Sequence, residues 1–383
     1  MQGKRYAVFS RFSVHTARVT HLIKIFTFYR EYAILCTKET RKSSFKGGTY
    51  GNLPACLADY NTNLNHTKGL LAPENTPYAL PFTFLRGAKP GPSLVVTGGL
   101  HSGEYPGVAA CARLSQTLSP EDLAGSVLLL HCVNETGFFA HSEALVPEGN
   151  VNLNGDFPGD LSGTPGKRLV AFMEQEIMPF ADYILDLHSG GGMEPLSPCL
   201  FFPVTAGENV LRTSLKMAAA TGIEHLVASS AKTGFYSFAA QHGVPGLLLE
   251  RGYGAMCREE DVSNYCTDVR GVLKAVNMLP GEPENTDKKT VWPKVDYLVA
   301  EHKGLWYPTV KKGDILPAGA LLGEVRDFWN NPLGEYRTLY ASRVLYHHTG
   351  LPLRPGDSLA ACAHTEEAFI LEDLEATVQR FLS

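Results

Sequence analysis

Side chains suited to metal-assisted chemistry follow short apolar runs at three separate places in this sequence. His101 and Glu104 lie in the glycine-rich stretch GGLHSGEYPG, directly after the apolar run 94–96. His188 ends the run ILDLH, one residue before three glycines, and Glu250 ends GLLLE in the stretch GLLLERGYG. Ligands of α/β proteins bind at the carboxyl ends of the strands, so we expect these side chains to converge at one edge of a sheet.

The residue types specify the chemistry expected at that edge. Two imidazoles and one carboxylate are typical of a catalytic zinc that keeps a position open for water, so His101, Glu104 and His188 are predicted to hold one Zn²⁺ per chain. Glu250 is the candidate general base. Asp186 lies two residues before His188 and shares its face of a strand. It either holds the imidazole through a ring N–H or serves as a salt-bridge partner.

Other catalytic patterns are weaker or missing in the sequence. His364 and Glu367 repeat the H-x-x-E spacing, which we interpret as a chance pair on a solvated helix. Ser102 and Ser189 lack the G-x-S-x-G context of a hydrolase nucleophile. The glycine stretches match neither a dinucleotide fingerprint nor a P-loop.

Apolar runs and helical periodicities alternate along the middle of the chain. This alternation predicts an α/β fold, with a mixed, mostly parallel sheet between helices. The expected strands are 93–99, 126–133, 182–188, 199–204, 225–230 and 246–250, and the expected helices are 104–118, 166–180, 209–221, 235–243 and 261–279.

Changes in composition suggest five segments. The stretch PGEPENTDKKT is rich in Pro, Gly and charge and reads as a linker, and short extended runs separated by Gly and Pro follow it. We therefore expect a basic extension (1–47), a zinc-dependent catalytic domain (48–280), a linker (281–290), a small all-β domain (291–363) and a helical tail (364–383).

Composition limits the classes of partner. The chain has 383 residues, is 44% hydrophobic and carries a formal net charge of −5, which argues against a nucleic-acid or acidic-membrane binder. Its eight cysteines form no CxxC pair, which suggests reduced thiols in a cytoplasmic protein. We expect a small-molecule substrate and allow for a homo-oligomer.

The first 47 residues hold ten lysines and arginines against two glutamates. Two interpretations of this segment stay open: a secretory signal, which it matches poorly, and a basic arm that binds a partner. We favour a third interpretation, in which the segment is a non-essential extension or the start site has been placed too far upstream.

Four ordered motifs resemble the succinylglutamate desuccinylase/aspartoacylase family of zinc carboxypeptidase-like amidohydrolases. They are RGAKPGPSLVVTGGLHSGEYPG, NVNLNGDFPG, ILDLHSGG and PGLLLERG, and the likeness spans about residues 80 to 363. The resemblance implies that His101, Glu104 and His188 bind zinc and that Glu250 is the general base. It also implies a mixed sheet with an appended β domain, and cleavage of an N-acyl amide by metal-activated water.

Two positions depart from the family pattern. The family usually carries arginines where Glu143 and Gly155 stand here, while its asparagine remains as Asn154. Those arginines polarise the scissile carbonyl and bind a substrate carboxylate, so their loss leaves the substrate class open. We treat Asn154, Arg168 and Arg251 as candidate substrate-binding residues.

The sequence favours a hydrolase that cleaves the amide bond of a small acylated amino acid or amine. Two alternatives stay open: a metallo-carboxypeptidase acting on peptides or cell-wall fragments, and a degenerate relative that binds zinc or a ligand without turnover.

Overall fold

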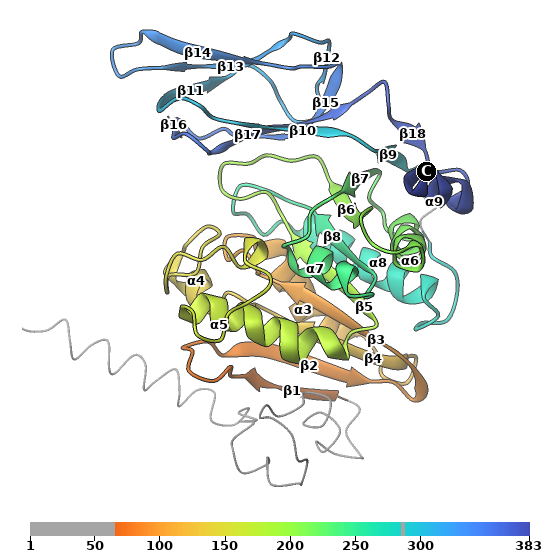
Figure 1. Ribbon diagram of the computed structural model, residues 1–383. Coiled ribbons are helices and arrows are strands. Elements are labelled where there is room, and N and C mark those ends of the chain that lie inside the picture. The colour runs from red at the N-terminus through yellow and green to blue at the C-terminus, as the bar shows by residue number, and fades with distance from the viewer. Residues whose placement is uncertain (1–65, 285–287) are drawn as a thin grey trace, which may run out of the picture.

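The computed structural model describes residues 66–284 and 288–383. The predicted basic extension 1–47 lies outside these residues. A ten-stranded mixed sheet forms the centre, with helices on both faces (Figure 1). Its strand order is β1 (His66–Leu71), β2 (Leu80–Arg86), β4 (Ala124–Leu130), β3 (Lys89–Gly98), β5 (Tyr183–His188), β8 (Gly246–Glu250), β6 (Cys199–Pro203), β7 (His225–Ser229), β9 (Thr290–Trp292) and β18 (Phe369–Ile370).

The central strands β4, β3, β5 and β8 run parallel, so their carboxyl ends share one edge. Period-2 alternation divides their side chains between the two faces. Leu94 and Val96 pack into one buried cluster, and Val95 packs into the other. Both faces are covered, which explains why these strands read as continuous apolar runs in the sequence.

The two faces have separate sets of helices. One face packs against α3 (Tyr105–Thr117), α6 (Glu208–Ala219), α8 (Glu259–Ala275) and α9 (Leu374–Leu382). The opposite face packs against α5 (Pro165–Phe172) and α7 (Phe235–Gln241). The short helix α4 (Glu135–Ala140) lies in the connection after β4. This arrangement confirms the predicted α/β fold class.

The C-terminal β region (295–364) consists of two antiparallel four-stranded sheets, which lie above the main sheet in Figure 1. The inner sheet has the order β10 (Val295–Val299), β17 (Ser358–His364), β15 (Ser342–His347) and β12 (Ile315–Leu316). The outer sheet has the order β14 (Pro332–Arg337), β13 (Leu321–Arg326), β11 (Gly304–Pro308) and β16 (Pro352–Leu353). Trp306, Val325 and Val344 belong to the core between them.

The inner sheet of this region also packs against the main sheet. Ala361 and Ala363 of β17 share a buried cluster with Cys199 and Val227. One sheet therefore contributes to two cores, and the C-terminal β region is held directly against the strands that carry the candidate site.

Two parts of the sequence fold differently from expectation. The predicted strands begin at residue 93, but β1 and β2 form an antiparallel pair at the edge of the main sheet. The tail is not one helix: His364 ends β17, and β18 pairs with β9 before α9 begins at Leu374. Phe369 and Leu371 pack against the core of the main domain, so burial outweighs the helical periodicity there. None of the described helices is long and apolar enough to cross a membrane.

Candidate active site

Close backbone packing places the loop between β3 and α3 over the end of β5. Gly99 adopts a left-handed conformation (φ +65°) directly after β3. A Cβ on Gly107 would come within 2.7 Å of the Leu187 carbonyl oxygen, so only glycine lets α3 approach β5 this closely. Glu104 is the residue just before α3, and its Oε2 accepts a hydrogen bond from Ser189 N at 2.9 Å. These contacts therefore join the first motif to the motif ILDLHSGG.

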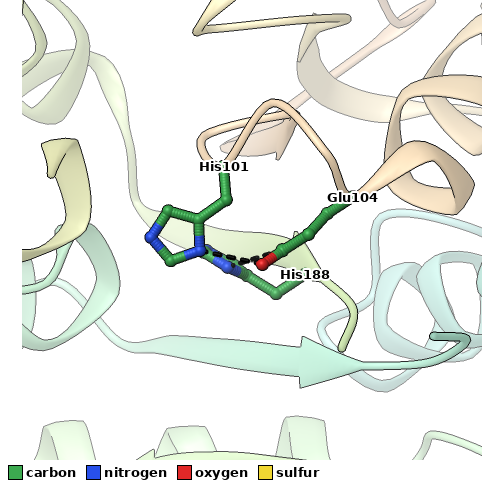
Figure 2. Close-up of side chains that lie close together, drawn as sticks. All are labelled: His101, Glu104 and His188. Atoms are coloured by element: carbon green, nitrogen blue, oxygen red, sulfur yellow. Dashed lines mark hydrogen bonds and ion pairs between the residues drawn. The ribbon is translucent and has the colours of Figure 1, made fainter. Parts of the chain in front are cut away.

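His101, Glu104 and His188 converge at this edge (Figure 2). Glu104 Oε1 lies 2.8 Å from His101 Nδ1, and Glu104 Oε2 lies 3.0 Å from His188 Nδ1. The candidate ligand atoms of all three residues lie within 4.8 Å of one another, so a single ion can contact all of them. The side chains of His188 and Glu104 are buried, at 2% and 8% exposure.

The charges at this cluster call for a cation. Burial alone would raise the pKa of Glu104, but His101 and His188 lower it to about 2. Burial would likewise lower the pKa of His188, but Asp186 and Glu104 raise it well above its ordinary value. The buried carboxylates therefore stabilise positive charge, whether it is a proton on the ring or a divalent metal ion. A donor set of two imidazoles and one carboxylate fits zinc.

A chain of close polar contacts behind His188 fixes the orientation of its ring. His188 Nε2 lies 3.1 Å from Asp186 Oδ2, which leaves Nδ1 facing the cluster. Thr97 donates a 2.6 Å hydrogen bond to Asp186 Oδ1 from the neighbouring strand, where the two residues are register partners. His101 is held similarly, because its Nε2 lies 3.0 Å from Asn152 Oδ1.

Tyr265 of α8 ties the ends of β5 and β8 together. Its hydroxyl contacts the carbonyl oxygens of His188 and Leu249 and accepts a 2.7 Å hydrogen bond from Arg251 N. The last residues of the two strands are thereby held in register, with His188 opposite Glu250.

Glu250 faces the site with an unsatisfied carboxylate. Its Oε2 is buried and has no hydrogen-bond partner among the described residues. Burial and the neighbouring Glu104 raise its pKa well above the ordinary value, while His188 opposes the shift. A carboxylate with one buried, unpaired oxygen and a raised pKa is suited to accepting and returning a proton.

The two candidate arginines are committed elsewhere. Arg251 follows Glu250 and points to the opposite face of the sheet, where its Nε lies 2.5 Å from Asp268 Oδ2 and its Nη2 lies 3.1 Å from Oδ1. Arg168 lies on α5 and donates to the carbonyl oxygen of Asn75. The structure brings neither guanidinium to the ligand cluster.

At the two positions where the resembling family has arginines, this chain has an acidic residue, Glu143, and a residue without a side chain, Gly155. Glu143 Oε1 accepts a 2.7 Å hydrogen bond from Gly192 N, and its carbonyl oxygen accepts one from Gly103 N at 2.8 Å. Its carboxylate therefore lies beside the loop that follows His188, and its backbone lies beside the loop that holds His101 and Glu104. Gly155 is exposed, and a Cβ there would meet only Asn152 atoms at 3.8 and 3.9 Å. The site has room for a side chain at Gly155 that the sequence does not supply.

A cavity of about 680 Å³ is lined by Glu250, and His101, Glu104 and His188 are not among its lining residues. Asn154 and Leu248 line it on the side of the main domain, and Asp296, Tyr297 and others line it on the side of the C-terminal β region. Asn154 Oδ1 itself accepts a hydrogen bond from Phe235 N. The C-terminal β region is therefore one wall of the candidate site.

Sequence reasoning missed several residues of this site. Tyr265 and Glu194 lie outside the four motifs, and Thr97 and Asn152 lie inside them but were not singled out. Burial, together with the charges of Glu104 and Glu143 and against the opposing effect of His101, raises the pKa of Glu194 to about 7, so it belongs to the same electrostatic environment. The NVNLNG motif gave a signal for Asn152, but only the next asparagine was singled out.

Comparison with known proteins identifies the family. A sequence model of the succinylglutamate desuccinylase/aspartoacylase catalytic domain matches residues 90–276, which include the ligand cluster and Glu250. This part of the chain is similar to that catalytic domain. A curated family relative, N-alpha-acetyl-L-2,4-diaminobutyric acid deacetylase from Halomonas elongata, is 26% identical over 287 residues, covering 73% of this chain and 84% of the relative.

Solved structures of the family share the fold. The succinylglutamate desuccinylase/aspartoacylase from Rhodobacter sphaeroides superposes with a TM-score of 0.71 at 25% identity, over 82% of this chain and 98% of that one. The product-bound ectoine utilization protein EutE (DoeB) from Ruegeria pomeroyi gives 0.69 at 24% identity, over 78% and 94%. The likeness includes most of the described chain and nearly all of each neighbour.

The buried pair Arg251–Asp268 leads to a test of what Arg251 does. Arg251→Met leaves Asp268 as an uncompensated buried charge, so we expect the free energy of unfolding to fall by about 3–5 kcal/mol. Urea denaturation of the variant and of Arg168→Met makes the comparison, and the second variant should lose less than about 1 kcal/mol. A stable Arg251→Met protein with a raised KM would instead assign the guanidinium to the substrate.

Proposed function

We propose that the protein is a zinc-dependent amidohydrolase that removes the acyl group from a small acylated amine or amino acid. The observation that carries this proposal is the convergence of His101, Glu104 and His188 beside the unpaired carboxylate of Glu250. The Halomonas relative is named as a deacetylase of an N-acetylated diamino acid, which supports the same reaction class.

His101, Glu104 and His188 would hold one zinc ion per chain. Zinc bound there lowers the pKa of a water molecule and polarises a carbonyl oxygen. Asp186 and Thr97 keep the His188 ring in the tautomer that offers Nδ1 to the ion.

Glu250 would accept the proton of the attacking water and deliver it to the leaving nitrogen. Burial leaves the carboxylate poorly solvated, which raises its affinity for a proton. The cation beside it would keep the carboxylate ionised before the reaction. Asn154 lies at the cavity wall, where its amide can donate to the substrate while its Oδ1 accepts from Phe235 N.

The remaining expectations belong to the same proposal. Residues 48–280 would form the catalytic domain, 281–290 the linker and 291–363 the small β domain that closes the cavity from the other side, followed by the tail 364–383. A cytoplasmic location and a homo-oligomeric state are also proposed. Among the described residues, six cysteines are free thiols, in keeping with a reducing compartment.

Replacing Glu250 tests the proposed base. Glu250→Gln keeps the size of the side chain but removes its basicity, so kcat should fall by about two orders of magnitude or more while the zinc content stays near one per chain. A panel of N-acyl amines, N-acyl amino acids and short peptides identifies the best substrate of the unaltered protein, and metal analysis accompanies the kinetics.

Near-normal turnover of the Glu250→Gln protein would assign the base to another residue. Faster cleavage of peptides than of every acylated amine would favour a peptidase. Zinc binding without turnover of any compound would indicate a non-catalytic relative.

Gly155 offers a second test, because the family's arginine can be restored there. Gly155→Arg places a guanidinium where the backbone and the neighbouring atoms leave room, and a guanidinium binds a carboxylate through two parallel hydrogen bonds. We expect the ratio of kcat/KM for an N-acetyl amino acid to that for its amide to rise at least tenfold, about 1.4 kcal/mol. Gly155→Gln, similar in reach but uncharged, serves as the control. An unchanged ratio would show that this corner does not meet the substrate.

A further inference from the structure

The strand register connects the ligand cluster to the cavity. His188 of β5 pairs with Glu250 of β8, and Leu248, two residues before Glu250, pairs with Phe201 of β6. Register partners, and residues two apart along one strand, project to the same face of a sheet. Leu248, Phe201 and Glu250 all line the cavity. The sheet face that carries His188 therefore continues past Glu250 as an apolar floor of the cavity.

Tyrosine rings form other walls of this cavity. Tyr297 of β10 and Tyr346 of β15 both pair with Ala361 of β17, which belongs to the buried cluster shared with the main sheet. The two rings therefore project from the inner sheet toward the main sheet, and both line the cavity. Tyr236 of α7 is 3% exposed and lines it as well. Aromatic and aliphatic side chains from both regions of the chain thus enclose the space beside Glu250.

The other charged side chains of the cavity are already paired. Lys294 has its Nζ 2.8 Å from Glu367 Oε1. Asp296 directly precedes the tyrosine of β10, so it projects to the opposite face of the inner sheet, where its Oδ2 lies 3.0 Å from His364 Nε2. Among the described lining residues, Glu250 is therefore the one charged group without such a partner. A charged ligand group would lose hydration here without gaining a new ion pair on the aromatic walls.

We infer that this cavity is a subsite for a bulky, uncharged apolar group of the substrate, above all an aromatic ring. The inference rests on the proposed amide hydrolysis and names the substrate class of that site. The volume of about 680 Å³ is typical of pockets that bind ligands much larger than an acetyl group. Burying an aromatic ring is favourable, and contacts with the edges and faces of other rings add to the gain. The ring can belong to the acyl group or to the amine, since both flank the bond that is cleaved beside Glu250.

Three amides that differ by one phenyl ring test the inference. N-acetylalanine is the reference, N-acetylphenylalanine adds the ring on the amine side, and N-phenylacetylalanine adds it on the acyl side. For the unaltered protein we expect kcat/KM for one of the two phenyl compounds to exceed that for N-acetylalanine at least tenfold, and the better compound identifies the side. A carboxylate at the para position of its ring should abolish the gain, because the cavity offers no unpaired cation among the described residues.

Filling the cavity tests where the ring binds. Ser230 lines the cavity and is exposed, so Ser230→Trp should fold normally and occupy part of the space. The ratio of kcat/KM for the better phenyl compound to that for N-acetylalanine should fall at least fivefold. Lys232→Trp adds the same side chain to the same loop at an exposed position outside the cavity lining, and it should leave the ratio unchanged.

A second variant removes a wall instead of filling the space. Tyr297 is 52% exposed, so Tyr297→Leu should fold normally while removing one ring. It should lower the same ratio at least threefold. Melting temperature and zinc content report whether each variant keeps its fold.

A binding measurement separates this inference from the proposed reaction. Glu250→Gln protein titrated calorimetrically should bind one phenyl compound at least fivefold more tightly than N-acetylalanine, and the added Ser230→Trp change should remove that difference. Such binding without hydrolysis of any amide would contradict the amidohydrolase while supporting the subsite. Equal hydrolysis of the three amides, or a phenyl preference that folded Ser230→Trp and Tyr297→Leu proteins both retain in full, would overturn the subsite and leave the reaction intact.

Discussion

The site depends on one electrostatic constraint: the Glu104 carboxylate is buried and needs positive charge beside it. An isolated ionised carboxylate is costly to bury, and this one is stabilised by two imidazoles and the Ser189 amide. The same contacts bring His101 and His188 together from two segments far apart in the sequence. A divalent cation among these atoms satisfies the constraint better than a single proton, which is why the cluster reads as a metal centre.

The rest of the fold holds this cluster in place. Parallel strands bring the ends of β3, β5 and β8 to one edge, and Tyr265 fixes the last residues of two of them from α8. Contacts run from Thr97 through Asp186 to His188. The register between β3 and β5 therefore fixes the orientation of the His188 ring. Because both connections are buried and rigid, the site is preorganised before any ligand binds.

The sequence predicted the edge of the sheet but not its supports. His101, His188 and Glu250 each follow an apolar run, and parallel topology is enough to bring such positions together. Thr97 could not be found, because its role comes from the register between β3 and β5. Arg251 was a candidate substrate ligand because it could replace the arginines that the family carries at positions 143 and 155. Alternation along a strand turns it to the opposite face, where it pairs with Asp268.

The C-terminal β region shows the same limit in another form. His364 reads as part of a solvated helix, because the charged residues after it have helical periodicity. In the structure it ends a strand that packs between two cores, and it lines the cavity opposite Glu250. The local sequence around His364 does not reveal that this residue lines a cavity, because the main domain and the C-terminal β region form that cavity together.

X-ray absorption at the zinc edge, combined with metal analysis, tests the central claim most directly. The purified protein should hold one zinc per chain, with nitrogen and oxygen ligands at about 2.0–2.2 Å, including the scattering pattern of two imidazoles. His101→Ala and His188→Ala should each lose most of the metal. A sulfur ligand at about 2.3 Å, or equal zinc in all three proteins, would contradict the account, because the chain's cysteines would then hold the ion instead.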